Sequence, residues 1–503
     1  MFRRGDVWRE TLRISSSGDS GKQITYSAFG KGPNPKILGS TSASGWVATS
    51  VKNVWQSENV TTNPWEIHAY RTEIFFEKKD GSVAWGRHRD FSPDFSPLTD
   101  EFDWCWNSGK LYVYSPSNPD QNYKSVEAPQ RKYAVMLQDK QYITIDHLDN
   151  SYHVLAGIAD NYQTYLLKSL RVTYCHISHI GVKNSSMAYG LDVHHSDSYY
   201  AFNDIENCGR RGISLTIYKT NVITLSNVII EYNRFHHGWH TTGVDCNNAG
   251  NHLITDIIIR NNLFDNVPDR IVDRHNSNDI FIANQSPGDG VVKNIYIYNN
   301  IFRNTQGSAV KFEAVTDVHV LNNTFYGVDP TLSSFQGLVV ATNGKNFNIR
   351  NNIFYNNCDH SFNKDFYNLY YNDSWPPFEY PAGWSVDNNL YYTTDKATDF
   401  MFFWIPSKPA YEARYKMIHW ELYKQAEKQD LHSPAPADPM FIDAVNGNYA
   451  LQKGSPAIGK GVKIDLVTKD FYGNPMNNPP DLGAIQYGSV PGKFFDEKVR
   501  FGK

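Results

Sequence analysis

Three acidic side chains fall at similar places in segments whose residues alternate as in short strands. Asp245 lies in TTGVDCNN, Asp273 in RIVDRHN and Glu313 in SAVKFEA. An aspartate is disfavoured in a strand and costly in a core unless it is paired, so we expect these carboxylates on an outward polar face. Carboxylates on neighbouring parallel strands would lie about 4.8 Å apart. Their repulsion would raise the pKa of one of them, which is the property of a general acid at neutral pH.

The same face is expected to carry further polar side chains in two columns. The residues expected to point inward are Leu191, Ile213, Val244, Val272 and Val310. The first outward column then consists of Asp192, Ser214, Asp245, Asp273 and Lys311, and the second of His194, Thr216, Asn247, His275 and Glu313. Arg274 points inward by strict alternation, so either the strand turns there or this register is shifted by one residue. A solvated or Ca²⁺-binding polar face is the alternative to a catalytic one.

Paired carboxylates are the machinery of glycoside hydrolysis. A retaining enzyme separates them by about 5–5.5 Å and an inverting enzyme by about 6.5–9.5 Å. The pair Asp245 and Asp273 fits the shorter distance, and Asp273 with Glu313 fits the longer one. We therefore predict Asp245, Asp273 and Glu313 as catalytic residues of a glycoside hydrolase. Substrate binding and charge tuning are assigned to their polar neighbours Asn247, Arg274, His275 and Lys311.

The segment FHHGWHTTG leads into the Asp245 strand and contains three histidines and a tryptophan. His237, Trp239 and His240 are predicted to form the wall of a sugar subsite, because an indole ring stacks well on a sugar face. A plain loop is the alternative. No fourth ligand follows His236, His237 and His240 at a regular spacing, so no metal or other cofactor is expected there, and structural Ca²⁺ is left open.

A repeated phrase sets the architecture. A β-rich run is followed by an asparagine and then an aromatic or aliphatic residue, as in IIEYNRF, IIIRNNLF, IYIYNNIF, VHVLNNTF and FNIRNNIF. Spacings of 23 to 38 residues with several short strands per copy predict a parallel β-solenoid. Stacked asparagines would form a ladder that satisfies buried backbone groups. The aligned positions are Asn203, Asn233, Asn262, Asn300, Asn323, Asn352 and Asn389.

The chain resembles the right-handed parallel β-helix superfamily of pectate-lyase-like, carbohydrate-active proteins. The likeness includes the opening RRGDVWRETLRISSSGDSGKQITYSAFGKGPNPKILGS and the closing stretches DPMFIDAVNGNYALQKGSPAIGKG and DLGAIQYG. It implies an all-β, single-stranded right-handed β-helix with first rungs at 1–40 and a main body at 131–395. Residues 41–130 are expected to form an inserted β-rich cap. Residues 396–432 are expected to form a helical insertion that covers an edge, with a lid as the alternative. Closing rungs and a tail are expected at 433–503.

Within that fold, AYGLDVHH resembles the YG-[F/I]-D-P-H motif of the mannuronan C5-epimerases. Tyr189, Asp192 and His194 take the positions for acid/base work and carboxylate neutralisation, whereas Val193 replaces the proline. The resemblance implies a polysaccharide lyase or epimerase acting on uronic acids as the second candidate. A non-catalytic glycan-binding β-helix is the third, and the ionisable residues of the polar face argue against it. In every reading these three residues are expected to contact substrate.

The composition bounds the partners. A net charge of −4 with 20% charged residues argues against nucleic acid as the main partner, whereas 32 tyrosines and 12 tryptophans suit sugar binding. Five scattered cysteines form no CxxC pair, and no apolar run approaches a membrane span. We expect a polysaccharide or oligosaccharide substrate and a secreted or periplasmic location, with any signal peptide removed, although a cytoplasmic location stays open. The oligomeric state is not predicted.

Overall fold

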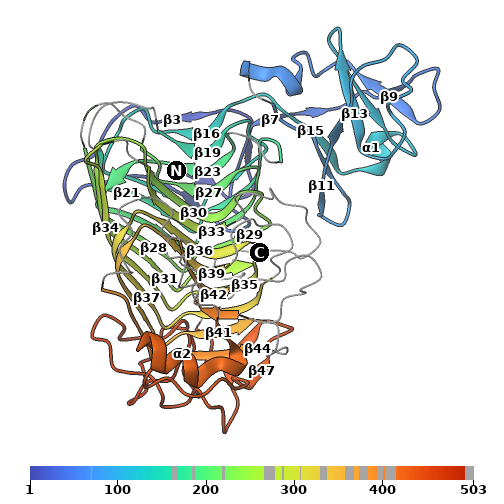
Figure 1. The fold of residues 1–503 in the computed structure, drawn as a ribbon. Helices are drawn as coiled ribbons and strands as arrows, with labels where there is room; N and C mark the ends of the chain where they lie inside the picture. Colours follow the sequence, from blue (N-terminus) through green and yellow to red (C-terminus); the bar gives the residue numbers. More distant parts are fainter. Residues whose placement is uncertain are drawn as a thin grey trace.

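The computed structural model describes residues 1–69, 71–160, 167–183, 187–217, 221, 223–265, 278–285, 288–305, 307–328, 337–356, 367–372, 383–393, 400–402 and 415–492. Three long sheets run side by side along one axis, and the chain coils through them in the order sheet 1, sheet 2, sheet 3 (Figure 1). Neighbouring strands are parallel along each sheet, apart from the last pair of sheet 1. This is the parallel β-helix that the repeat predicts.

The strands of the three sheets are as follows. Sheet 1 contains β3 (Leu12–Arg13), β16 (Tyr133–Met136), β19 (Ala156–Ala159), β23 (Tyr189–Asp192), β27 (Arg211–Ser214), β30 (Thr241–Asn248), β33 (Asn278–Asn284), β36 (Ser308–Glu313), β39 (Gly337–Thr342), β42 (Tyr367–Asn372), β45 (Phe400–Phe402) and β46 (Tyr415–Lys416). Sheet 2 contains β4 (Ile24–Tyr26), β17 (Ile143–Asp146), β21 (Leu170–Thr173), β25 (Ser198–Ala201), β28 (Thr224–Glu231), β31 (Leu253–Arg260), β34 (Val291–Tyr298), β37 (Thr316–Leu321), β40 (Lys345–Arg350) and β43 (Ser385–Asp387). Sheet 3 contains β2 (Val7–Trp8), β6 (Lys36–Leu38), β18 (Asp149–Ser151), β22 (His176–Ile180), β26 (Asp204–Cys208), β29 (Arg234–His236), β32 (Leu263–Asp265), β35 (Ile301–Thr305), β38 (Thr324–Val328), β41 (Ile353–Asn356) and β44 (Leu390–Thr393).

Identical side chains stack inside the coil because each rung repeats the one before it. In sheet 3 an inward column of rings has centroid spacings of 4.7 to 5.1 Å, close to the spacing of the strands themselves. The column consists of Phe235, Phe264, Phe302, Phe325, Phe354 and Tyr391, all fully buried. Aliphatic columns from sheets 1 and 2 complete the core.

The predicted asparagine ladder is confirmed at the turn between sheets 2 and 3. The backbone N–H of each asparagine donates to the side-chain oxygen of the next one, at 2.9 to 3.0 Å, and each side-chain NH₂ donates to a backbone carbonyl of the preceding rung. The ladder ends at Asn389, whose N–H donates to the Ser433 hydroxyl. All seven predicted positions are members, so they belong to the scaffold.

A cap is inserted between β6 and β16, beside the first rungs (Figure 1). One of its sheets is antiparallel, with β7 (Ser40–Ala43), β15 (Ser125–Pro129), β10 (Phe75–Glu77) and β11 (Val83–Trp85). The other contains β8 (Val47–Ala48), β9 (Val54–Ser57), β14 (Lys110–Tyr114), β13 (Asp103–Asn107) and β12 (Arg87–His88). Two short helices, η1 (Pro64–Ala69) and α1 (Pro119–Asn122), belong to it as well. Three two-stranded pairs complete the strand inventory: β1 (Phe2–Arg3) with β5 (Ala28–Phe29), β20 (Leu167–Lys168) with β24 (His195–Ser196), and β47 (Phe441–Asp443) with β48 (Asn448–Leu451).

The C-terminal part covers the coil rather than extending it. After η2 (Met417–His419), the helix α2 (Trp420–Glu427) places Trp420 and Tyr423 against Tyr391 and so closes the end of the core. The expectation of closing rungs at 433–503 is wrong for its described part, 433–492, because β47 and β48 form an antiparallel hairpin outside the three sheets. Apolar residues of this segment, such as Phe441 and Leu482, pack with Ile353 of sheet 3. No helix within the described ranges is long and apolar enough to cross a membrane.

Candidate active site

The outer face of sheet 1 carries the predicted polar columns, with one rung changed. Pairing along the sheet aligns Asp192 with Ser214, Ser214 with Asp245, Asp245 with Phe281, and Phe281 with Lys311. Strand β33 therefore takes the place that was predicted for the Asp273 strand. Ile280 replaces Val272 in the inward column, and Ala283 replaces His275 in the second outward column.

The predicted pair of Asp245 and a neighbouring Asp273 strand is therefore wrong. The prediction failed because more residues separate sheets 3 and 1 in this rung: β32 ends at Asp265 and β33 begins at Asn278. Counting a fixed number of residues from Asn262 stops inside this connection. Asp273, Arg274 and His275 themselves lie outside the described residues, and their assigned roles stay predictions.

Asp245 is fully buried, not exposed as predicted. Its Oδ2 lies 2.9 Å from Nε of Arg211, and its Oδ1 accepts a hydrogen bond of 2.8 Å from the Thr216 hydroxyl. Burial raises the pKa of Asp245 above its ordinary value, and the Arg211 guanidinium opposes that shift. The partner of this carboxyl group is therefore a cation, Arg211, and not the second carboxylate that we expected.

Arg211 is the residue of this face that the sequence interpretation missed. It aligns with Tyr189 on β23, and its guanidinium lies 5.6 Å from the centre of that ring. The next residue, Gly212, has room for no side chain, because a Cβ there would lie 2.5 Å from the carbonyl oxygen of Thr242. An arginine at the first position of the strand, directly before a glycine, was the available signal.

Asp192 and His194 lie beside this ion pair. Nε2 of His194 is 2.6 Å from the carbonyl oxygen of Thr216, so the ring donates there, and it is 4.0 Å from Oδ1 of Asp192. Both side chains are buried, as is Tyr189. The structure thus brings the three residues of the epimerase-like motif together with Arg211 and Asp245.

The other end of the face reaches solvent at Glu313. Its side chain is 25% exposed, and Oε1 lies 2.7 Å from Nζ of the buried Lys311. Its second oxygen accepts a hydrogen bond of 2.9 Å from Gln285, which in turn accepts one of 2.7 Å from Asn247. Asp245 and Glu313 lie on strands two rungs apart, which corresponds to about 10 Å along the axis.

The predicted subsite residues lie at the turn from sheet 3 into sheet 1, next to the cap. Trp239 meets Trp85 of β11 edge to face, with ring centroids 6.1 Å apart. Nζ of the exposed Lys183 lies 4.6 Å from the Trp239 ring and 5.6 Å from the Trp85 ring. His240 is buried, with Nδ1 3.1 Å from the Thr241 hydroxyl. Trp85 and Lys183 come from distant segments, and no spacing in the sequence connects them with Trp239.

His237 lies on the same turn, with its Nδ1 2.6 Å from Nδ1 of His236. Within the described part of the chain, Glu206, His236 and His237 are the one group of three or more histidine, cysteine or acidic residues whose ligand atoms all lie within 4.8 Å of one another. These are the described residues best placed to hold a metal ion.

Solved structures of other proteins are similar to this chain in fold. The structure of XylC in complex with xylose covers 97% of this chain and 93% of its own, with a TM-score of 0.54 and 11% identity. The pectate lyase Pel9A covers 70% and 88%, with a TM-score of 0.38 and 12% identity. The GH136 lacto-N-biosidase from Eubacterium ramulus covers 79% and 58%, with a TM-score of 0.32 and 14% identity. No protein-family profile and no curated protein matches the sequence. The sheet topology and the likeness to XylC show that the chain has a parallel β-helix fold.

Proposed function

We propose that the protein is a carbohydrate-active enzyme that hydrolyses glycosidic bonds of a polysaccharide or oligosaccharide. The observation that carries the proposal is the outer face of sheet 1, where two carboxyl groups, Asp245 and Glu313, are held by two cations in different environments. Glycoside hydrolysis needs two such groups, one kept protonated and one ionised. We also propose that the protein is secreted to the compartment that contains this substrate.

In this proposal Asp245 is the general acid and Glu313 the general base. Burial favours the protonated form of Asp245, which suits donation to the leaving oxygen. The partly exposed Glu313, ion-paired with Lys311, is placed to accept a proton from an attacking water. Their strands are about 10 Å apart and Glu313 aligns with Asn247, two residues along the strand from Asp245, so the backbones are too far apart for a retaining pair and suit an inverting pair only if the two side chains reach towards each other.

One further observation supports a sugar as the ligand. It is not the pair of indole rings at the neighbouring turn, because Trp85 and Trp239 are both buried. The XylC structure, which shares the fold over nearly the full length of this chain, holds xylose.

A uronate lyase or epimerase is the second candidate, and Arg211 favours it. Such enzymes need a group that neutralises the substrate carboxylate, beside an acid and a base. Arg211 on β27 lies over Tyr189 of the neighbouring strand β23, which also contains Asp192 and leads to His194. An arginine is suited to a carboxylate because its planar fork binds two oxygens at once.

Incubation with a panel of polysaccharides separates the candidates. New reducing ends without ultraviolet absorbance from an unsaturated uronate indicate hydrolysis, and such absorbance indicates a lyase. Absence of any product, with glycan binding retained, contradicts an enzymatic function and leaves a binding protein.

The variant Asp245→Asn then tests the catalytic assignment. We expect a loss of about 100-fold or more in kcat, because asparagine has no proton to transfer. Asp265→Asn is the matched control, since Asp265 is also buried and is paired with Arg303 at 2.5 Å, but on sheet 3. Equal activity of the two folded variants would contradict the assignment.

A further inference from the structure

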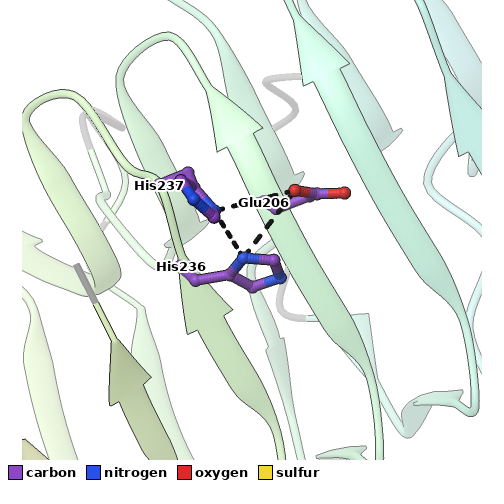
Figure 2. Close-up of side chains that lie close together, drawn as sticks. All are labelled: Glu206, His236 and His237. Carbon is purple, nitrogen blue, oxygen red and sulfur yellow. Dashed lines mark hydrogen bonds and ion pairs between the residues drawn. The ribbon is translucent and has the colours of Figure 1, made fainter. Parts of the chain in front are cut away.

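The turn between sheets 3 and 1 carries a triad whose atoms converge on one point. Nδ1 of His236 lies 2.6 Å from Nδ1 of His237 and 3.7 Å from Oε2 of Glu206, and Nδ1 of His237 lies 3.8 Å from the same oxygen (Figure 2). A point equidistant from these three atoms lies about 2 Å from each of them, which is the length of a zinc bond to imidazole nitrogen or carboxylate oxygen.

The fold builds this arrangement. Glu206 on β26 and His236 on β29 are paired in register, so their side chains stand next to each other on the same face. Two consecutive strand residues would normally point to opposite faces. His237, however, follows with a φ of 56°, and this left-handed turn brings its ring to the side of His236.

Each of two ligand candidates is oriented from behind by another side chain. Nε2 of His236 lies 2.8 Å from Oδ1 of Asp204, so it donates to that carboxylate and leaves the Nδ1 lone pair of the neutral ring facing the triad. Nε2 of His176 lies 3.1 Å from Oε1 of Glu206, and Asn207 donates to Oε2 at 2.9 Å. In known metal sites a histidine ligand likewise donates its other ring N–H to a carboxylate, and a carboxylate ligand is held by hydrogen bonds.

Acceptor atoms converge at the triad. The lone pair of His236 Nδ1 faces Oε2 of Glu206 at 3.7 Å, and a proton on His237 or a metal ion between the three atoms would offset their repulsion. A shared proton can join only two of the three atoms at a time, whereas a metal ion joins all three. His237 is 28% exposed and Glu206 20% exposed, so a fourth coordination position faces solvent.

From this geometry we propose that Glu206, His236 and His237 bind one divalent transition-metal ion, with Zn²⁺ the ion that best matches two imidazoles and a carboxylate. The proposal goes beyond glycan hydrolysis and does not depend on it. The site lies on sheet 3 and its turn, whereas the proposed catalytic carboxylates lie on sheet 1.

Calorimetric titration of the metal-stripped, untagged protein with Zn²⁺, in the absence of glycan, tests the proposal. We expect one ion per chain, and a dissociation constant raised about 100-fold in both His237→Ala and Glu206→Gln. Asp204→Asn should weaken binding about 10-fold, because it removes only the support behind His236. His147→Ala is the matched control. His147 is 27% exposed and pairs with a carboxylate, Asp146, but it lies at the turn between sheets 2 and 3.

Thermal unfolding distinguishes loss of the site from loss of the fold. In EDTA, His237→Ala and His147→Ala should unfold near the temperature of the parent protein, and Zn²⁺ should raise the Tm of the parent and of His147→Ala but not of His237→Ala. Substoichiometric binding by the parent protein, or unchanged binding by both ligand variants, would overturn the proposal. Either result is independent of whether any polysaccharide is cleaved.

Discussion

The two turns that flank sheet 3 share a backbone conformation and differ in their side chains. At the turn from sheet 2, residues with positive φ are followed rung after rung by an asparagine of the ladder. At the turn into sheet 1, residues with φ between 53° and 62° are again stacked, but successive rungs carry Tyr152, His179, Asn207 and His237. The first turn repeats one side chain, the asparagine after the positive-φ residue, to satisfy the backbone, whereas these four rungs of the second turn repeat no side chain. Stability is therefore expected to depend on the first turn, and chemistry on the second turn and the face of sheet 1 beside it.

The largest expected effect on stability comes from breaking the ladder. Asn262 accepts from the backbone and side chain of Asn233 and donates to the carbonyl of Ile230. Asn262→Leu leaves these buried groups unsatisfied and should lower the free energy of unfolding by about 4 kcal/mol, measured by urea denaturation. Asn348→Leu, at a half-buried position on the outer face of β40, should cost less than about 1 kcal/mol. Equal losses would mean that the ladder has no special role.

A smaller loss is expected from Arg211→Met on sheet 1. The substitution leaves the Asp245 carboxylate buried without its cation and should cost about 3 kcal/mol at pH 8. The pKa of Asp245 is higher in the folded protein than in the unfolded chain, so stability is lost as the pH rises from the unfolded pKa to the folded pKa. Removing Arg211 raises the folded pKa further and widens this pH range. The loss should therefore shrink towards pH 4. A loss that does not change with pH would show that packing, not charge, is responsible.

A gain in stability is expected at the contact between the cap and the second turn. Glu73, whose N–H donates to the carbonyl of Gly181, is buried, and burial raises its pKa to about 7 although Trp104 donates to it. The folded protein keeps this proton to a higher pH than the unfolded chain, so stability falls as pH rises from about 4.5 to about 7. Glu73→Gln should add about 2 kcal/mol at pH 8 and nothing at pH 4. Unfolding measurements at the two pH values check this, and an equal effect at both would contradict it.

The smallest effect is expected from Lys183→Met at the same turn. The exposed ammonium group over Trp85 and Trp239 should contribute only about 0.5 kcal/mol to stability. If the turn serves ligand binding, the same variant should change glycan affinity more than it changes stability. Thermal unfolding and a glycan-binding titration on one sample measure the two changes. Negligible changes in both stability and affinity would contradict a role of this turn in ligand binding.

The repeat made the fold and the ladder predictable. Each asparagine has the same task in every rung, so its neighbours in sequence repeat with it, and the inward columns at Leu191, Ile213, Val244 and Val310 follow. The register failed only where the rung is longer, at Asp273. The longer spacing between Asn262 and Asn300 was a visible warning of that.

The site was predictable only in part, because its contacts join rungs and the cap. That Asp245 faces outward followed from alternation, but its burial and its pairing with Arg211 depend on the neighbouring strand. Likewise Trp85, Lys183 and Glu206 meet the Trp239 turn from three separate segments. Such contacts carry no periodic signal.

The central claim is that the outer face of sheet 1 performs the chemistry while similar ion pairs elsewhere only support the fold. The most direct test compares the kcat of Glu313→Gln with that of Glu231→Gln on a glycan that the parent protein cleaves. Glu231 is paired with Arg260 at 2.5 Å on the outer face of sheet 2 and is the matched carboxylate. We predict a loss of about 100-fold or more for Glu313→Gln and less than about twofold for Glu231→Gln. Near-normal turnover by a folded Glu313→Gln protein would contradict the account.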